Sequence, residues 1–284
     1  MTEETINKYI KSIPNQNTKK AYKLSLNKFH TFLQENSIDD INQENINTII
    51  QDYKAYLNTK NLKPVTITHH IIILKTFIND YTPIEYNKSL KLIKTEKTKP
   101  KYLTIEQIKT VLKYTDNKTD ELIIKLLSNT GLRIHEALKI TRKELQNTDE
   151  EGHAIIPVTG KNNKRRLIVI PTQLTKDLKK YSKNNKKYVF ESKRQPLQQM
   201  SNRGIQHRFK KLATRVDEAE NTNIYSENLK PHNLRHSFAI EALKTNEINY
   251  VKEFLGHENI ATTQIYTDLK EKEVVERFKD IEII

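Results

Sequence analysis

The chain has 284 residues, a formal net charge of +14 and a pI near 9.5. An excess of lysine and arginine of this size is the electrostatic footprint of a nucleic-acid-binding protein, although a lysine-rich proteome produces the same composition. The chain contains no cysteine, which excludes disulfides, thiolate nucleophiles and cysteine-based zinc sites.

The amino terminus has no basic region followed by an apolar run, so the sequence predicts no signal peptide. The longest apolar run, residues 71–74, is far too short to cross a bilayer. We therefore expect a cytoplasmic protein without a membrane partner, built as one large or two medium domains.

Residues 1–83 carry apolar side chains at helical spacing in three stretches, which predicts a small helical bundle. Asn17 is placed to cap the first of these helices. Pro64 fits the start of the third helix, and Pro83 ends it. Four lysines lie off the apolar stripe, where a phosphate-facing surface and a solvated face are equally good interpretations. These lysines are Lys19, Lys20, Lys23 and Lys28.

Residues 84–97 are interpreted as a linker, because this region passes into a lysine- and threonine-rich segment without apolar periodicity. The remainder, residues 98–280, opens with Thr104 and a glutamine three residues later, a capping-box pattern that starts a helix. A second helix is predicted to end at Gly131, where glycine permits a left-handed cap. A third helix is expected to follow from Ile134.

The pattern changes to period two between residues 153 and 171, which predicts a β-hairpin. The tip of this hairpin is strongly basic, with Lys161, Lys164, Arg165 and Arg166. From residue 174 onward the pattern is mainly helical again, including residues 240–255. The polar segment 216–229 allows no assignment. Apolar side chains in residues 274–281 predict a short amphipathic helix near the end of the chain.

Four short segments carry the residue types of phosphate chemistry, but each is a weak signal of function by itself. They are residues 130–133, 160–161, 232–236 and 255–266. An arginine after a helix break, as at Arg133, is usually a cap or a surface charge. Lys161 is of a kind common in solvated turns, and Tyr266 is one of thirteen tyrosines. Glycines beside these segments, Gly131 among them, indicate tight turns placed at a site.

Taken together and in order, these segments resemble the tyrosine recombinase (phage integrase) family, in particular its Xer-type members. The residues that match the family's catalytic pattern are Arg133, Lys161, His232, Arg235, His257 and Tyr266. The resemblance is strong over about residues 99–280 and looser in the helical region before them.

The resemblance implies a mainly α-helical protein with two domains that clamp around DNA. A core-binding, SAM-like helical bundle would precede a mixed α/β catalytic domain containing a small β-hairpin or sheet. The activity implied is site-specific cutting and rejoining of DNA through a 3′-phosphotyrosine, for dimer resolution or for integration and excision. The family uses no metal, ATP or other cofactor. Double-stranded DNA is the expected partner, bound by a homo-oligomer that assembles as a tetrameric synapse.

The residue types fit that chemistry. Two arginines can clamp the non-bridging oxygens of a phosphate with planar donor forks and stabilise the charge of the transition state. The family pattern makes Tyr266 the nucleophile and Lys161 the general acid that protonates the leaving 5′-oxygen. His232 and His257 would bind the phosphate or assist proton transfer. His135 stands where the family commonly has a small residue, so we expect it to be structural or to line the edge of the site.

Other interpretations remain open at this point. His232 and His236 have the spacing of a zinc-binding pair, but Asn233 stands where a zinc peptidase needs glutamate. The sequence around Lys161 lacks the first glycine and the Ser or Thr of a nucleotide-binding loop. A non-catalytic DNA-binding relative and a type IB topoisomerase are the serious alternatives. We expect the terminal segment, residues 273–284, to be a docking helix that packs onto a neighbouring subunit and couples four protomers on two duplexes. The alternative is that it folds back on its own domain.

Overall fold

The structure is a computed structural model in which helices dominate. It describes residues 3–87, 101–160 and 165–256, together with Phe278 and Ile284. The chain divides into two compact units, unit 1 (Met1–Thr98) and unit 2 (Lys99–Ile284). The described residues contain one two-stranded sheet, which lies in unit 2, so the predicted mainly α-helical fold is confirmed.

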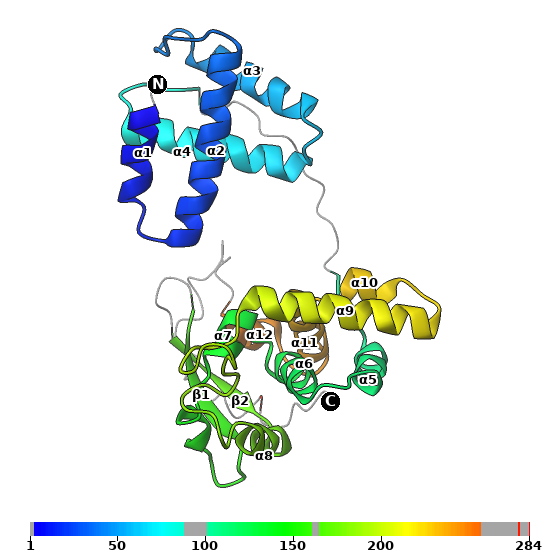
Figure 1. The fold of residues 1–284 in the computed structure, drawn as a ribbon. Coiled ribbons are helices and arrows are strands. Elements are labelled where there is room, and N and C mark those ends of the chain that lie inside the picture. Colours follow the sequence, from blue (N-terminus) through cyan, green and yellow to red (C-terminus); the bar gives the residue numbers. More distant parts are fainter. Residues whose placement is uncertain (1–2, 88–100, 161–164, 257–277, 279–283) are drawn as a thin grey trace. The chain divides into compact units, whose positions relative to one another are not determined.

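Unit 1 is a bundle of helices around an aromatic and aliphatic core. Its helices are α1 (Glu3–Ser12), α2 (Gln16–Glu35), α3 (Ile46–Thr59) and α4 (Pro64–Tyr81) (Figure 1). Tyr53 of α3 is fully buried, and its ring lies 4.9 Å from that of Phe29 of α2, centroid to centroid. Tyr9 of α1 packs edge-on against Phe77 of α4 at 5.0 Å and donates a hydrogen bond to Asp80. These ring contacts hold α2 against α3 and α1 against α4, which are distant in sequence.

The three helices predicted for unit 1 are confirmed, but its first helix was not predicted. Helix α1 buries Ile6 and Ile10, one turn apart, against the core. The cap assigned to Asn17 is wrong, because α2 begins at Gln16 and Asn17 lies within its first turn. The side chain of Asn15 caps it and accepts the backbone N–H of Asn17 at 2.9 Å.

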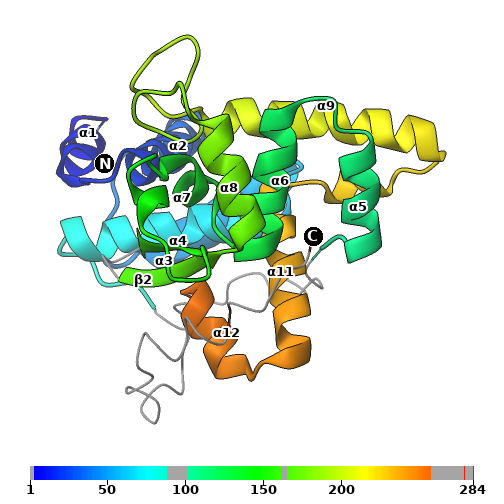
Figure 2. The same ribbon diagram turned by 90° about the horizontal axis from the view of Figure 1, so that it is seen from below.

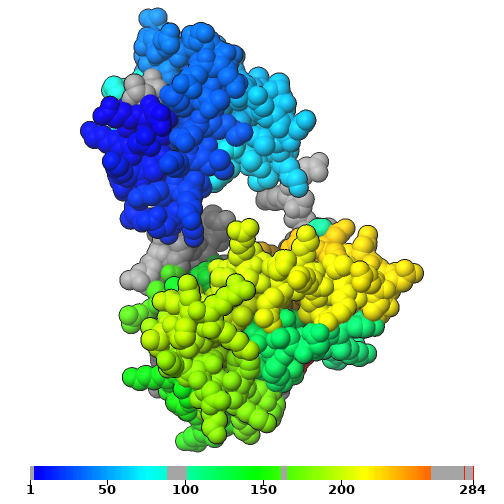
Figure 3. Space-filling view, viewed as in Figure 1, coloured from blue at the N-terminus to red at the C-terminus, as the bar shows by residue number. Residues whose placement is uncertain are grey.

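Unit 2 is built around helix α6, which is buried along most of its length. Figure 2 shows α6 with α8 on one side and α5 on the other, and Figure 3 shows α9 at the outer surface. The helices are α5 (Ile105–Lys113), α6 (Lys118–Thr130), α7 (Ile134–Lys139), the 3-10 helix η1 (Glu144–Gln146), α8 (Thr172–Tyr181), α9 (Asn202–Glu220), α10 (Ile224–Asn228), α11 (Pro231–Thr245) and α12 (Ile248–Leu255). The predicted capping box at Thr104 and the predicted stop at Gly131 are confirmed.

The predicted β-hairpin is confirmed. Strands β1 (Ala154–Thr159) and β2 (Arg165–Ile170) pair antiparallel, with Ala154 opposite Ile170 at the open end. Side chains alternate between the two faces of the pair, as period two requires. The buried face of β2 carries Arg166 in line with two isoleucines, so a charged side chain enters the core of unit 2.

The helical pattern predicted over residues 240–255 is confirmed, with one break. The backbone is extended at Asn246, directly after α11, and α12 starts at Ile248. The side chain of Asn246 donates to the carbonyl of Ala242 and closes the last turn of α11. The unassigned segment 216–229 contains the end of α9 and the short helix α10.

The end of the chain contacts its own unit at the two residues described there. The ring of Phe278 stacks on that of Phe254 at 3.9 Å, and the backbone of Ile284 forms two 3.2 Å hydrogen bonds with the side chain of Asn129. The helix predicted for residues 274–281 otherwise lies outside the described residues. In the described part of the chain, no helix is both long and apolar enough to cross a membrane.

Candidate active site

The site is built around the end of α6. Gly131 has a φ of +59°, and its N–H donates to the carbonyl of Leu127 at 3.0 Å. A Cβ at this position would lie 2.5 Å from the side chains of Leu255 and Phe238. Only glycine therefore combines this left-handed turn with the close approach of α11 and α12. The turn directs the chain toward Arg133.

Arg133 forms the N-cap of α7 and is held there by Glu136. The carboxylate of Glu136 accepts the backbone N–H of Arg133 at 2.8 Å and its guanidinium Nη1 at 3.2 Å. Glu136 is 4% exposed, whereas the side chain of Arg133 is 32% exposed. Glu136 thus holds the backbone and one guanidinium nitrogen of Arg133, and the rest of the guanidinium stays partly accessible.

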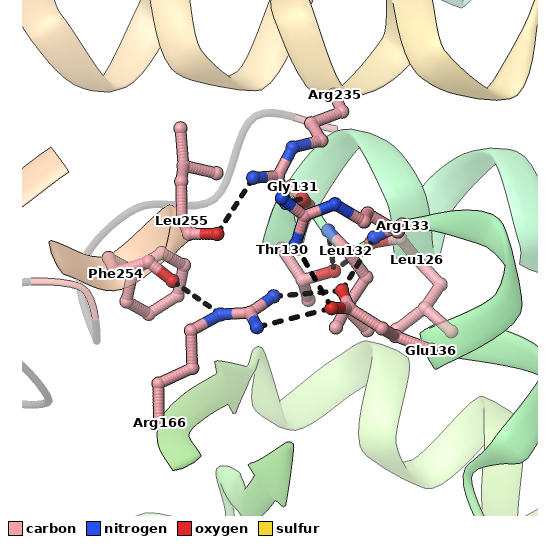
Figure 4. A network of polar contacts seen from close by, with 10 residues as sticks. All are labelled: Leu126, Thr130, Gly131, Leu132, Arg133, Glu136, Arg166, Arg235, Phe254 and Leu255. Carbon is pink, nitrogen blue, oxygen red and sulfur yellow. Dashed lines mark hydrogen bonds and ion pairs between the residues drawn. The ribbon is translucent and has the colours of Figure 1, made fainter. Parts of the chain in front are cut away.

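Arg235 lies on α11, three residues after His232, so both side chains lie on one face of the helix. The Arg235 guanidinium is buried and donates through Nη1 to the carbonyl of Gly131 at 2.5 Å and through Nη2 to that of Leu255 at 2.7 Å. One side chain therefore joins the ends of α6 and α12 (Figure 4).

A third arginine enters this network from β2. Arg166 donates through Nη1 and Nη2 to the two oxygens of Glu136, at 3.2 and 2.8 Å, and through Nε to the carbonyl of Phe254 at 2.9 Å. Neither Glu136 nor Arg166 was predicted as a site residue. The placement of Arg166 in the basic hairpin tip is wrong, because this side chain lies within β2 and is buried. Two signals were available: Glu136 occupies the third position of a predicted helix, and Arg166 lies on the apolar face of a predicted strand.

The three guanidinium groups interact electrostatically. Burial, together with the charges of Arg133 and Arg166, lowers the pKa of Arg235 to about 9, so Arg235 is still charged at neutral pH. Burial by itself would raise the pKa of Glu136, but the hydrogen bonds from Arg166 hold it below its ordinary value. Glu136 is therefore a carboxylate, and it is shared by Arg133 and Arg166.

Two histidines line the first turns of α11. The rings of His232 and His236 meet edge to face, with centroids 4.4 Å apart. Burial, followed by the charges of Arg235 and Arg133, lowers the pKa of His232. His232 is therefore neutral at neutral pH, and a neutral ring can donate one hydrogen bond and accept another. His135 is exposed and lines a cavity of about 290 Å³ next to Glu136.

Three of the six predicted catalytic residues lie within the described part of the chain, and the structure brings Arg133, His232 and Arg235 together. Lys161, His257 and Tyr266 lie outside the described residues. Helix α12 ends at Leu255, and Gly256 follows it with a φ of +66°. A Cβ on Gly256 would lie 3.2 Å from the side chain of Arg166.

One group of described side chains has the composition of a metal site. A ligand atom from each of Asp149, Glu151 and His153 lies within 4.8 Å of the others. Asp149 accepts the backbone N–H of His153 at 2.9 Å and contacts its ring at 3.2 Å, while Glu151 is 66% exposed. These bonds close the turn before β1, which accounts for the cluster without an ion.

Two family descriptions match the chain. The phage integrase family matches residues 101–273, and the phage integrase SAM-like domain matches residues 2–81. The tyrosine recombinase XerA of Pyrococcus horikoshii is 34% identical over 205 residues, covering 69% of this chain and 68% of that protein. The tyrosine recombinase XerD of Rickettsia prowazekii is 30% identical over 270 residues, covering 88% and 86%.

Among solved structures, the fold is similar to that of the XerH site-specific recombinase bound to a palindromic difH substrate. The TM-score is 0.68, the sequence identity is 22%, and the match covers 96% of this chain and 83% of that one. At this identity the likeness shows a shared fold.

Proposed function

The chain belongs to the phage integrase family and is a tyrosine recombinase, and we propose that it exchanges DNA strands through a covalent bond to Tyr266. Its relatives are recombinases by name, and XerH was solved on its DNA substrate. Double-stranded DNA carrying a specific recombination site is the partner.

The observation that carries this assignment is the charge of the arginine cluster. The guanidinium groups of Arg133 and Arg166 bind the carboxylate of Glu136, whereas that of Arg235 binds backbone carbonyls. Together the four side chains carry a net charge of +2. Buried charge without a counter-charge is unfavourable, so the cluster favours a bound anion. A DNA phosphate supplies that charge, and the charge on its oxygens grows in the transition state, where preorganised donors act most strongly.

The reaction follows from these positions and from the family pattern in the sequence. The Tyr266 hydroxyl oxygen attacks phosphorus and gives its proton to the imidazole of His257, while the bond from phosphorus to the 5′-oxygen breaks. Arg133 and Arg235 bind the non-bridging oxygens. Lys161 gives a proton to the 5′-oxygen, and the neutral His232 contributes a hydrogen bond to the phosphate. A free 5′-hydroxyl then attacks the 3′-phosphotyrosine, restores the tyrosine and seals the strand.

The two domains have different roles, DNA binding and catalysis. We assign residues 1–83 as a core-binding DNA domain, residues 84–97 as a linker and residues 98–280 as the catalytic domain. The match to the SAM-like domain supports the first assignment. Lys20 and Lys23 of α2 are exposed, as phosphate contacts require. Binding through such contacts weakens steeply as salt rises.

The proposed assembly follows from the number of bonds broken. Exchange of both strands between two duplexes breaks four phosphodiester bonds, and each Tyr266 forms one phosphotyrosine. Four chains on two duplexes are therefore the expected unit of reaction. Its substrate is chromosomal, plasmid or viral DNA, which places the enzyme in the cytoplasm. The contacts of Phe278 and Ile284 favour a terminal segment that folds back on its own unit.

A nicked suicide substrate tests the proposed function. Binding sites are first selected from duplexes with randomised arms and are then nicked next to the scissile phosphate, so that the leaving fragment diffuses away. Wild type is expected to accumulate a covalent protein–DNA adduct, and Tyr266→Phe to form none. The matched control is Tyr102→Phe, because Tyr102 is an exposed tyrosine. An adduct formed by Tyr266→Phe would refute the assignment of the nucleophile.

A further inference from the structure

Arg166 is an arginine in the core of unit 2. Its side chain is 7% exposed, whereas that of Arg165, the preceding residue of β2, is exposed. Both residues follow the basic tip of the hairpin directly. Burying a guanidinium is costly unless its donors are bonded and its charge is paired. A surface arginine that bound DNA would bear no such cost, so the burial of Arg166 requires another explanation.

The donors of Arg166 join three elements. Two parallel hydrogen bonds reach Glu136 at the start of α7, and a third reaches the carbonyl of Phe254 near the end of α12. Figure 4 shows the guanidinium between these two partners. A planar fork can hold a carboxylate in one orientation, whereas a lysine ammonium would act as a point charge.

The partner at α7 connects Arg166 to Arg133. Each oxygen of Glu136 accepts one hydrogen bond from Arg133 and one from Arg166. Without Arg166 the buried carboxylate would be neutralised by Arg133 alone. The Arg133 guanidinium would then turn inward to Glu136 and lose part of its positive charge toward a phosphate.

The partner at α12 connects Arg166 to Arg235. Arg166 binds the carbonyl of Phe254, and Arg235 binds the next carbonyl, that of Leu255. Carbonyls at a helix end lack partners within the helix, so these two arginines satisfy them and fix where α12 stops. A Cβ on Gly256 would lie 3.2 Å from the side chain of Arg166, so the backbone rests directly on it.

We propose that Arg166 is a positioning residue for the arginine clamp: through Glu136 and the end of α12 it sets where Arg133 and Arg235 meet the scissile phosphate. This inference rests on the proposed function, because the clamp is defined by that chemistry. Arg166 itself does not touch DNA. Its effect should appear in the cleavage rate and leave the affinity for an uncut site unchanged.

The test measures single-turnover cleavage on the nicked substrate and the affinity for the intact site. For Arg166→Met we expect cleavage about 100-fold slower, the size of effect that a displaced catalytic group produces, with affinity within about threefold of wild type. The matched control is Arg208→Met, which removes another arginine–carboxylate pair of unit 2, that with Asp120. Its cleavage rate should stay within about threefold of wild type.

A second substrate separates the clamp from the general acid. With sulfur in place of the bridging 5′-oxygen, the leaving thiolate needs no proton, so the defect of Lys161→Ala should be restored. The defect of Arg166→Met should persist on this substrate, because the clamp acts on the non-bridging oxygens. Restoration of Arg166→Met by sulfur would overturn the proposal, and so would wild-type cleavage or a parallel loss of DNA affinity.

Arg166→Lys decides the question if Arg166→Met does not fold. Lysine keeps the charge but cannot bind both oxygens of Glu136 and the carbonyl of Phe254 together. We expect a folded protein, by circular dichroism, with cleavage at least about tenfold slower at unchanged affinity. Cleavage at the wild-type rate would overturn the proposal. Adduct formation by wild type tests the proposed function. The ratio of the variant's cleavage rate to the wild-type cleavage rate tests the role of Arg166.

Discussion

Gly131→Ala tests whether the left-handed turn after α6 is required by the packing of unit 2. The φ of +59° costs a residue with a Cβ about 1–2 kcal/mol. The new methyl group would also lie 2.5 Å from the buried side chains of Leu255 and Phe238, and relieving such overpacking costs about 1–3 kcal/mol. The expected loss is therefore about 2–5 kcal/mol, a large part of the roughly 5–15 kcal/mol that stabilises a domain.

Urea unfolding of the full chain, followed by circular dichroism, measures this loss as a lower midpoint for unit 2. The control is Gly204→Ala, because Gly204 lies in the first turn of α9 and its Cβ would meet only the hydroxyl of Ser201. That variant should stay within about 1 kcal/mol of wild type. Unfolding of Gly131→Ala at the wild-type urea concentration would show that neither backbone strain nor close packing requires glycine at this position.

Two further predictions concern stability. Burial, followed by the charges of Lys28 and His69, lowers the pKa of His70 below its ordinary 6.5. The unfolded chain therefore binds that proton more tightly, and stability present above pH 6.5 is lost as pH falls, by at most about 1.4 kcal/mol per pH unit. Urea midpoints at pH 7.5 and 5.5 should differ less in His70→Leu than in wild type. His207→Leu, at an exposed histidine of α9, should keep the difference, and equal behaviour of the two variants would contradict the role of His70. Thr104→Ala removes the capping box of α5 and should cost about 1 kcal/mol in the same assay, with no change counting against the cap.

The local structure of unit 2 was largely predictable from the sequence. The cap at Thr104, the stop at Gly131 and the hairpin before residue 171 depend on residues a few positions apart, and all are confirmed. Helix boundaries that no proline, glycine or capping residue marks were harder to predict. Helix α1 was not predicted, and the break at Asn246 was missed because no proline or glycine marks it.

The candidate site divides in the same way. By itself, the sequence determined the family, because the predicted arginine, lysine, histidine and tyrosine residues stand in the order that the family has along its chain. Only the tertiary structure decided how the arginines are held. Arg235 binds a carbonyl 104 residues away, and Arg166 pairs with Glu136 across 30 residues. Such contacts carry no periodic signal, because they exist only once α6, α7, β2, α11 and α12 meet in one core.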